Sequence, residues 1–142
     1  MSVAALDLGR RRIGVAVTDA AAMGAYPVGV VERRSITRDL EAIAAMLRDR
    51  EVMTFVIGLP LNMNGSEGPA AKAARTFAER VADAFKVSVE MFDERLTSFE
   101  AEERLKGMPV KKGARKPAID AIAATVILEG WMQSRVEKTS RQ

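Results

Sequence analysis

Four acidic residues lie at positions where α/β proteins usually carry their catalytic or ligand-binding residues. Asp7 follows one apolar run, Asp93 and Glu94 follow another, and Asp120 lies near the start of an apolar helical segment. In open α/β sheets the ligand site lies beyond the carboxyl ends of the parallel strands. Acids from distant segments that meet there favour a metal site over a set of salt bridges, and ligation by oxygen alone selects Mg²⁺ or Mn²⁺. Such ions activate water and neutralise charge on a phosphate.

Each acid also has a simpler structural interpretation. Asp7 is suited to initiating a turn, and Asp93 and Glu94 are suited to the position before a helix N-terminus. Asp120 could be stabilised by its helix N-terminus or by Lys116, but burying an ionised carboxylate without a partner is costly, so it needs a partner or a metal. The choice between Asp93 and Glu94 stays open, because alternate residues near a strand end point to opposite faces.

The composition narrows the possible chemistry. The chain has 142 residues with no histidine and no cysteine, which excludes disulfides, thiolate catalysis and zinc sites built on sulfur. Its length and its 48% apolar content predict one domain over residues 1–137, followed by a frayed tail over residues 138–142. We find no apolar run long enough for a membrane helix and no signal-peptide core, so we expect a cytoplasmic protein that does not bind membranes.

The basic residues gather in two places. The chain carries a formal net charge of +3, with arginines at 10–12 and a basic, acid-free segment over residues 104–116. Both clusters suit phosphates along a polynucleotide, although a charge run is also common on a solvated face. The candidate substrate-binding residues in these clusters are Arg10, Arg11, Arg12, Lys111, Lys112, Arg115 and Lys116.

Apolar periodicity predicts the elements that position these residues. It predicts strands over 3–8, 13–18, 28–31, 52–59 and 87–92, and helices over 37–50, 70–81, 97–106 and from 117 onward. The first strands follow one another through short connections, so they are expected to be antiparallel. The order predicts an α/β fold, a five-stranded mixed sheet flanked by helices.

Four motifs together identify a family resemblance. They are Asp7-Leu8-Gly9 running into Arg12-Ile13-Gly14-Val15-Ala16, Gly58-Leu59-Pro60 with Asn64-Gly65, Asp93-Glu94-Arg95-Leu96-Thr97-Ser98, and Ile119-Asp120-Ala121-Ile122-Ala123-Ala124. In this order and spacing the chain resembles the YqgF (RuvX) family of pre-16S rRNA nucleases. That family is similar in fold to Holliday-junction resolvases and to the RNase H-like superfamily, and the resemblance covers the chain from Asp7 to about Trp131.

The resemblance implies a metal-dependent nuclease that processes the 5′ end of pre-16S ribosomal RNA. It implies that Asp7, Glu94 and Asp120 are catalytic and bind Mg²⁺ or Mn²⁺, as two ions, with Asp93 as a supporting acid and Arg95 as a phosphate contact. The expected partner is precursor ribosomal RNA or the assembling small ribosomal subunit, and the expected state is a monomer or weak homodimer. Gly58-Leu59-Pro60 offers no acid where some resolvases place one, which makes a Holliday-junction resolvase the less favoured nuclease.

Two other classes of protein remain as alternatives. A non-catalytic RNA-binding or ribosome-assembly module could keep the same fold, since fold does not imply activity. A nucleotide-binding phosphotransferase of the actin and hexokinase type also opens with a strand ending in Asp-x-Gly. Such proteins need two lobes, however, and the chain contains no Gly-x-x-x-x-Gly-Lys-[Ser/Thr] loop.

Overall fold

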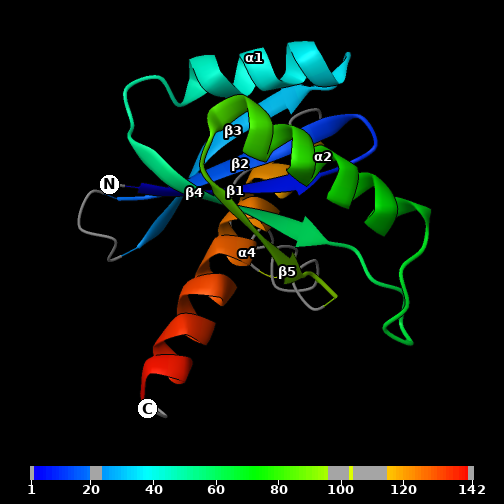
Figure 1. Cartoon of the computed structure of the whole chain (residues 1–142), viewed down its shortest axis with the longest axis vertical. Coiled ribbons are helices and arrows are strands. Elements are labelled where there is room, and N and C mark those ends of the chain that lie inside the picture. The colour runs from blue at the N-terminus through cyan, green and yellow to red at the C-terminus, as the bar shows by residue number, and fades with distance from the viewer. Residues whose placement is uncertain (1, 20–23, 96–102, 104–114, 141–142) are drawn as a thin grey trace.

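A mixed sheet with helices on both faces forms the centre of the protein (Figure 1). The computed structural model describes residues 2–19, 24–95, 103 and 115–140. In chain order the elements are β1 (Ser2–Leu8), β2 (Arg12–Thr18), β3 (Ala25–Glu32), α1 (Ile36–Met46), β4 (Val52–Leu59), α2 (Pro69–Phe85), β5 (Ser88–Asp93) and α4 (Arg115–Ser140). The sheet order is β3-β2-β1-β4-β5, antiparallel from β3 to β1 and parallel from β1 to β5. This confirms the predicted five-stranded mixed sheet with its first three strands antiparallel.

The two faces of the sheet are covered differently. Helices α1 and α2 pack on one face, and α4 crosses the other, where it contacts β1, β2, β3 and β4 (Figure 1). The core beneath α1 and α2 is built on large side chains such as Leu6 and Phe55. Beneath α4 the sheet presents small side chains, including Ala5 and Ala16. The small side chains allow α4 to lie close to the strands that carry the candidate acids.

Helix α1 begins and ends earlier than its sequence predicts. Ser35 is its N-cap, with Oγ accepting a hydrogen bond of 3.2 Å from the backbone N–H of Arg38, so Thr37 lies inside the helix. The helix ends at Met46 rather than near residue 50. Its apolar face is buried as predicted at Leu40, and sequence analysis missed a buried acid beside it, Asp39.

Helix α4 is longer at both ends than its sequence predicts. It begins at Arg115, two residues before Pro117, and the proline is accommodated in its first turn. It continues to Ser140, so residues 138–140 are helical where we expected a frayed tail. The predicted helix over 97–106 and most of the basic segment over 104–116 lie outside the described residues. Among the helices that the structure describes, none combines the length and the apolar character needed to cross a bilayer.

Candidate active site

Asp7 lies at the carboxyl end of the central strand, on the face that α4 covers. Ala5, two residues earlier in β1, packs beneath α4, whereas Leu6 packs beneath α1 and α2. Because side chains alternate along a strand, Asp7 shares the face of Ala5. Its partner across the antiparallel pairing is Gly14 of β2. Because Gly14 has no side chain, the backbone of α4 at Asp120 comes close to the strand beside Asp7.

Glu94 reaches the same face from the end of β5. Its backbone N–H donates to the carbonyl of Leu59 at 3.2 Å, which extends the pairing of β4 with β5 by one residue. Phe92 packs beneath α4, so Glu94 lies on that face and Asp93 is directed to the opposite one. A Cβ at Gly58 of β4 would overlap the Glu94 carboxylate. The carboxylate therefore occupies the space that a side chain at Gly58 would fill.

The carboxyl groups of Asp7 and Glu94 form a coupled pair. The pKa of Asp7 is raised to about 6, chiefly by burial and then by the charge of Asp120, while a hydrogen bond with Glu94 lowers it. The pKa of Glu94 is raised to about 8 by burial first, and then by the charge of Asp7, the hydrogen bond with Asp7 and the charge of Asp93. The hydrogen bond between the two side chains lowers the pKa of Asp7 and raises the pKa of Glu94. The carboxyl group of Glu94 is therefore the hydrogen-bond donor, and the carboxylate of Asp7 is the acceptor. Of the two groups, Glu94 is therefore the one that keeps its proton to higher pH.

Asp93 has a different partner from Glu94. Arg95 donates to its carboxylate from Nη2 at 2.6 Å and from Nε at 2.9 Å. These side-chain hydrogen bonds are the main reason that the pKa of Asp93 is lowered. Arg95 also donates from Nη1 to the carbonyl of Met63 at 3.4 Å. Arg95, predicted as a phosphate contact, is thus bound to its neighbour and to the loop after β4.

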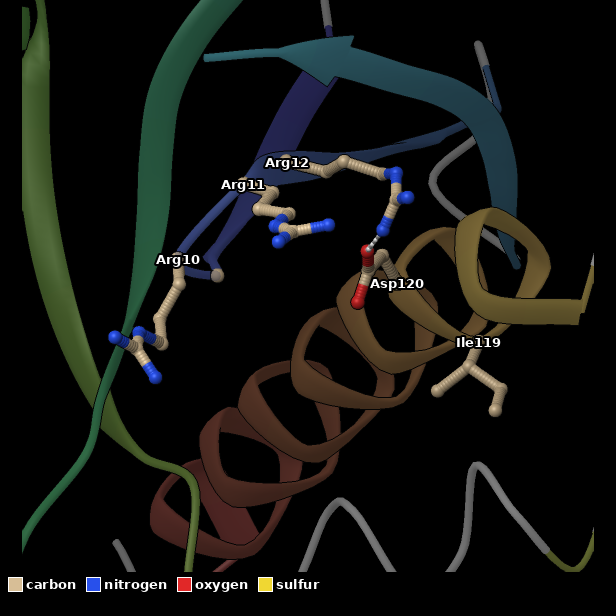
Figure 2. Close-up of a pocket in the computed structure, with 6 residues that line it drawn as sticks. Arg10, Arg11, Arg12, Ile119 and Asp120 are labelled. Atoms are coloured by element: carbon tan, nitrogen blue, oxygen red, sulfur yellow. Dashed lines mark ion pairs between the residues drawn. The ribbon is translucent and has the colours of Figure 1, made fainter.

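Asp120 is placed by the contact between α4 and β2. A Cβ at Gly14 would overlap the backbone carbonyl of Asp120, so the helix rests on the bare backbone of the strand. Arg12 lies on the same strand and its Nη1 is 3.9 Å from Asp120 Oδ2 (Figure 2). The Nε of Arg12 is 3.4 Å from the carboxylate of Glu32 on β3. Arg12, predicted to bind substrate, therefore bridges two acids of the protein.

Arg10 and Arg11 lie in the turn between β1 and β2 and are exposed. The turn lines a pocket of about 710 Å³ whose described lining residues are Gly9, Arg10, Arg11, Arg12, Ile119 and Asp120. Figure 2 shows Arg12 directed at Asp120 and Arg10 directed away from it. The arginines, alike in sequence, therefore divide into one that binds an acid and two that are open to a ligand.

An ion pair between Arg33 and the buried acid Asp39 supports this turn. Arg33 donates from Nη1 to the carbonyl of Gly9 at 2.8 Å, and its backbone N–H donates to the carbonyl of Arg11 at 2.8 Å. Its Nε lies 3.9 Å from Asp39 Oδ2, and the Asp39 side chain is only 3% exposed. Oδ1 of Asp39 accepts from the backbone N–H of Arg34 at 2.8 Å. Sequence analysis missed the ion pair of Arg33 and Asp39. An acid beside the apolar face of a predicted helix is, however, a signal that could have indicated it.

The pair of Asp7 and Glu94 suits a divalent cation. Both groups are hard oxygen donors, and burial together with their proximity raises the pKa of each, so a positive charge beside them would favour their ionised forms. Within the described part of the chain no three acidic side chains gather closely enough to enclose a metal. Asp120, held by Arg12, acts on Asp7 through its charge. The structure thus brings Asp7 and Glu94 together. Asp120, the third predicted ligand, lies near enough for its charge to raise the pKa of Asp7.

Replacing Glu94 tests the coupling of the pair in metal-free protein. The folded-state pKa of Glu94 is above its ordinary value of 4.5, so its contribution to stability is lost as pH rises toward about 8. We expect the melting temperature of the wild type to fall over this range and that of Glu94→Gln to fall less. Above about pH 8 the variant should be more stable by over ~1 kcal/mol, since one pKa unit is about 1.4 kcal/mol. Parallel melting curves with EDTA measure this, and identical pH profiles for the two proteins would contradict the coupling.

The sequence matches a known protein family over most of its length. The RuvX family model, described as Holliday junction resolvase, matches residues 1–134. The chain belongs to the RuvX family. A relative from Anaeromyxobacter sp. (strain Fw109-5) is 52% identical over 130 residues, which covers 92% of this chain and 95% of the relative. A relative from Myxococcus xanthus (strain DK1622) is 43% identical and covers 94% of this chain and 89% of its own length. Both carry the name "Putative pre-16S rRNA nuclease".

Solved structures support the fold of this RuvX chain. The RuvC structure from Thermus thermophilus aligns with a TM-score of 0.53 and 16% identity, covering 94% of this chain and 97% of RuvC. At this identity the likeness concerns the fold alone. The predicted family and the predicted RNase H-like fold are both confirmed.

Proposed function

We propose that this RuvX protein is a divalent-metal-dependent nuclease that processes the 5′ end of pre-16S ribosomal RNA. The observation that carries the proposal is the pair of Asp7 and Glu94, whose buried carboxyl groups lie within hydrogen-bonding distance at the carboxyl ends of β1 and β5. The turn that carries Arg10 and Arg11 lies between β1 and β2, next to Asp7. The names of the relatives supply the substrate.

The acids have distinct roles in this proposal. Asp7 and Glu94 would hold Mg²⁺ or Mn²⁺, and Asp120 would add the third carboxylate, with a pair of ions as the expected number. When bound, such an ion lowers the pKa of water and neutralises the charge that develops on the scissile phosphate. Glu94 must then give up the proton that it donates to Asp7, so binding is favoured by rising pH.

Basic residues would hold the RNA. Arg10 and Arg11 are exposed at the pocket beside Asp120 and suit phosphate oxygens. Lys111 and Lys112 lie outside the described residues, and Arg115 and Lys116 begin α4; all four stay predicted phosphate contacts. We further propose that the protein acts in the cytoplasm, on precursor RNA or the assembling small subunit, as a monomer or weak homodimer.

Adjacent arginines provide a matched test of these roles. Arg12→Gln removes the ion pair with Asp120, so we expect kcat to fall about tenfold, the lower end of the usual effect of removing a partner of a metal-binding carboxylate. Arg10→Gln removes an exposed charge, so we expect weaker RNA binding, a smaller salt dependence and an unchanged kcat. Single-turnover cleavage at saturating enzyme separates the two effects. The division of roles is wrong if both variants show the same loss of binding and no change in kcat.

The description of the family model favours resolution of four-way DNA junctions as a second candidate function. The two candidates are separated by incubating one preparation with precursor RNA and with a four-way DNA junction, in Mn²⁺ and in EDTA. We expect metal-dependent cleavage of the RNA at lower enzyme concentration. Cleavage of the junction alone would make the protein a resolvase, and cleavage of neither would favour a non-catalytic binding module.

A further inference from the structure

A buried carboxylate in α1 lies outside the proposed metal site, on the face of the sheet opposite α4. Asp39 belongs to the first turn of α1, and only 3% of its side chain is exposed. Burying a carboxylate is costly unless hydrogen bonds and an opposite charge compensate it. Oδ1 of Asp39 accepts a hydrogen bond of 2.8 Å from the backbone N–H of Arg34, and Arg33 supplies the opposite charge beside Oδ2. Asp39 therefore helps to fix the position of the Arg33 guanidinium.

The residue Arg33 connects this acid to the turn between β1 and β2. Its Nη1 donates to the carbonyl of Gly9 at 2.8 Å, and its backbone N–H donates to the carbonyl of Arg11 at 2.8 Å. Within the turn, the backbone N–H of Gly9 donates to the carbonyl of Arg12 at 2.8 Å. Arg33 thus supplies two of the hydrogen bonds that hold the backbone on which Arg10 and Arg11 are carried.

The contacts of Arg33 require a guanidinium rather than any positive charge. A guanidinium is a planar fork of five N–H donors, so its nitrogens can meet different acceptors at the same time. In Arg33, Nη1 meets the carbonyl of Gly9 while Nε lies 3.9 Å from Oδ2 of Asp39. Its Cζ also lies 5.9 Å from the centroid of the Phe77 ring. Arg33 is therefore held by the protein on several sides.

We propose that Arg33 is a positioning residue for RNA binding, which holds the turn so that Arg10 and Arg11 meet the phosphates; the inference rests on the proposed nuclease function. A mobile segment loses conformational freedom when it binds a ligand, and this loss lowers its affinity. A turn that is already fixed has less freedom to lose. Arg12 is held separately, because it belongs to β2 and pairs with Glu32 of β3. Arg33 would therefore act on RNA affinity through the two exposed arginines.

The variant Arg33→Lys tests this proposal without a change in net charge. Lysine keeps a positive charge beside Asp39, but its single ammonium does not reproduce the fork. We expect RNA binding in EDTA to weaken about tenfold, within the range for ordering a mobile segment on binding, and its salt dependence to become smaller. Amide hydrogen exchange at Gly9 should become faster in the free protein. Arg33→Gln combined with Asp39→Asn removes both charges together and should show the same losses.

A double-mutant cycle separates positioning from direct contact with the RNA. In a background of Arg10→Gln with Arg11→Gln, Arg33→Lys should weaken binding no further, because the side chains that the turn presents are already gone. Arg48→Gln is the control for an exposed arginine, since Arg48 lies beyond the other end of α1 and should leave RNA affinity close to that of the wild type. An undiminished loss in the double background would overturn the inference, because Arg33 would then contact RNA itself or act on the whole fold.

The outcomes also separate this inference from the proposed function. Cleavage by the wild type with Mn²⁺ reports the nuclease function, whereas binding in EDTA and amide exchange report the turn. The inference is overturned if Arg33→Lys binds RNA like the wild type or leaves the exchange of Gly9 unchanged, even where cleavage is observed. Wild-type protein that binds RNA through the turn but never cleaves it would instead overturn the nuclease function and leave the role of Arg33 standing.

Discussion

Asp7→Asn is expected to reduce metal-dependent cleavage of RNA about a thousandfold, because it removes a ligand of an ion that stabilises the transition state by several kcal/mol. The amide keeps the shape of the side chain, so the fold should remain. Metal-free protein should become slightly more stable, since the carboxyl of Asp7 is partly buried and its pKa is raised. Single-turnover cleavage, circular dichroism and thermal melting with and without Mn²⁺ measure these effects.

Asp83 provides a control for the loss of an acid. It is exposed on α2, on the face of the sheet opposite α4, so Asp83→Asn should cleave RNA and respond to Mn²⁺ like the wild type. A folded Asp7→Asn protein that keeps both its cleavage rate and its stabilisation by Mn²⁺ would show that Asp7 holds no metal.

Gly14→Ala is expected to destabilise the protein by about 3 kcal/mol, because the added methyl overlaps a backbone carbonyl rather than a mobile side chain. The overlap is with Asp120, so α4 must move away from β2 to accommodate it. The movement would carry Asp120 away from Arg12 and Asp7, and cleavage should fall with stability. Urea unfolding measures the free energy of unfolding, and cleavage below the unfolding transition measures the second effect.

Gly24→Ala is the matched control for this substitution. A Cβ at Gly24 would meet the Tyr26 ring and hydroxyl at ordinary contact distances, 3.5 Å or more, so the change should cost little. Wild-type stability in Gly14→Ala would contradict the close packing of α4 on β2.

Much of the fold follows from local patterns in the sequence. The apolar run that precedes Asp7 and the apolar run of β4 are sufficient to identify strands, and the order of elements then permits few sheets. The boundaries were less predictable because they depend on caps: Ser35 rather than Thr37 begins α1, and α4 continues to Ser140. Caps are decided by single hydrogen bonds, which periodicity does not contain.

The candidate site was predictable in its residue types but not in its pairings. The position of Glu94 on the α4 face depends on the phase of β5 relative to its neighbours, which a sequence does not reveal. Arg10 and Arg12 look equivalent in the sequence, yet only Arg12 belongs to a strand and meets Asp120, a residue more than a hundred positions away. Contacts across such separations arise from the packing of α4 on the sheet.

The most direct test of the central claim is cleavage of an end-labelled RNA that carries the precursor 5′ extension. Wild-type protein and Asp120→Asn are compared with Mn²⁺, with Mg²⁺ and with EDTA. We predict cleavage by the wild type with either ion, none with EDTA, and a loss of cleavage in the folded variant. Cleavage that persists in EDTA, or that Asp120→Asn retains at the wild-type rate, would contradict a carboxylate-held metal as the source of the activity.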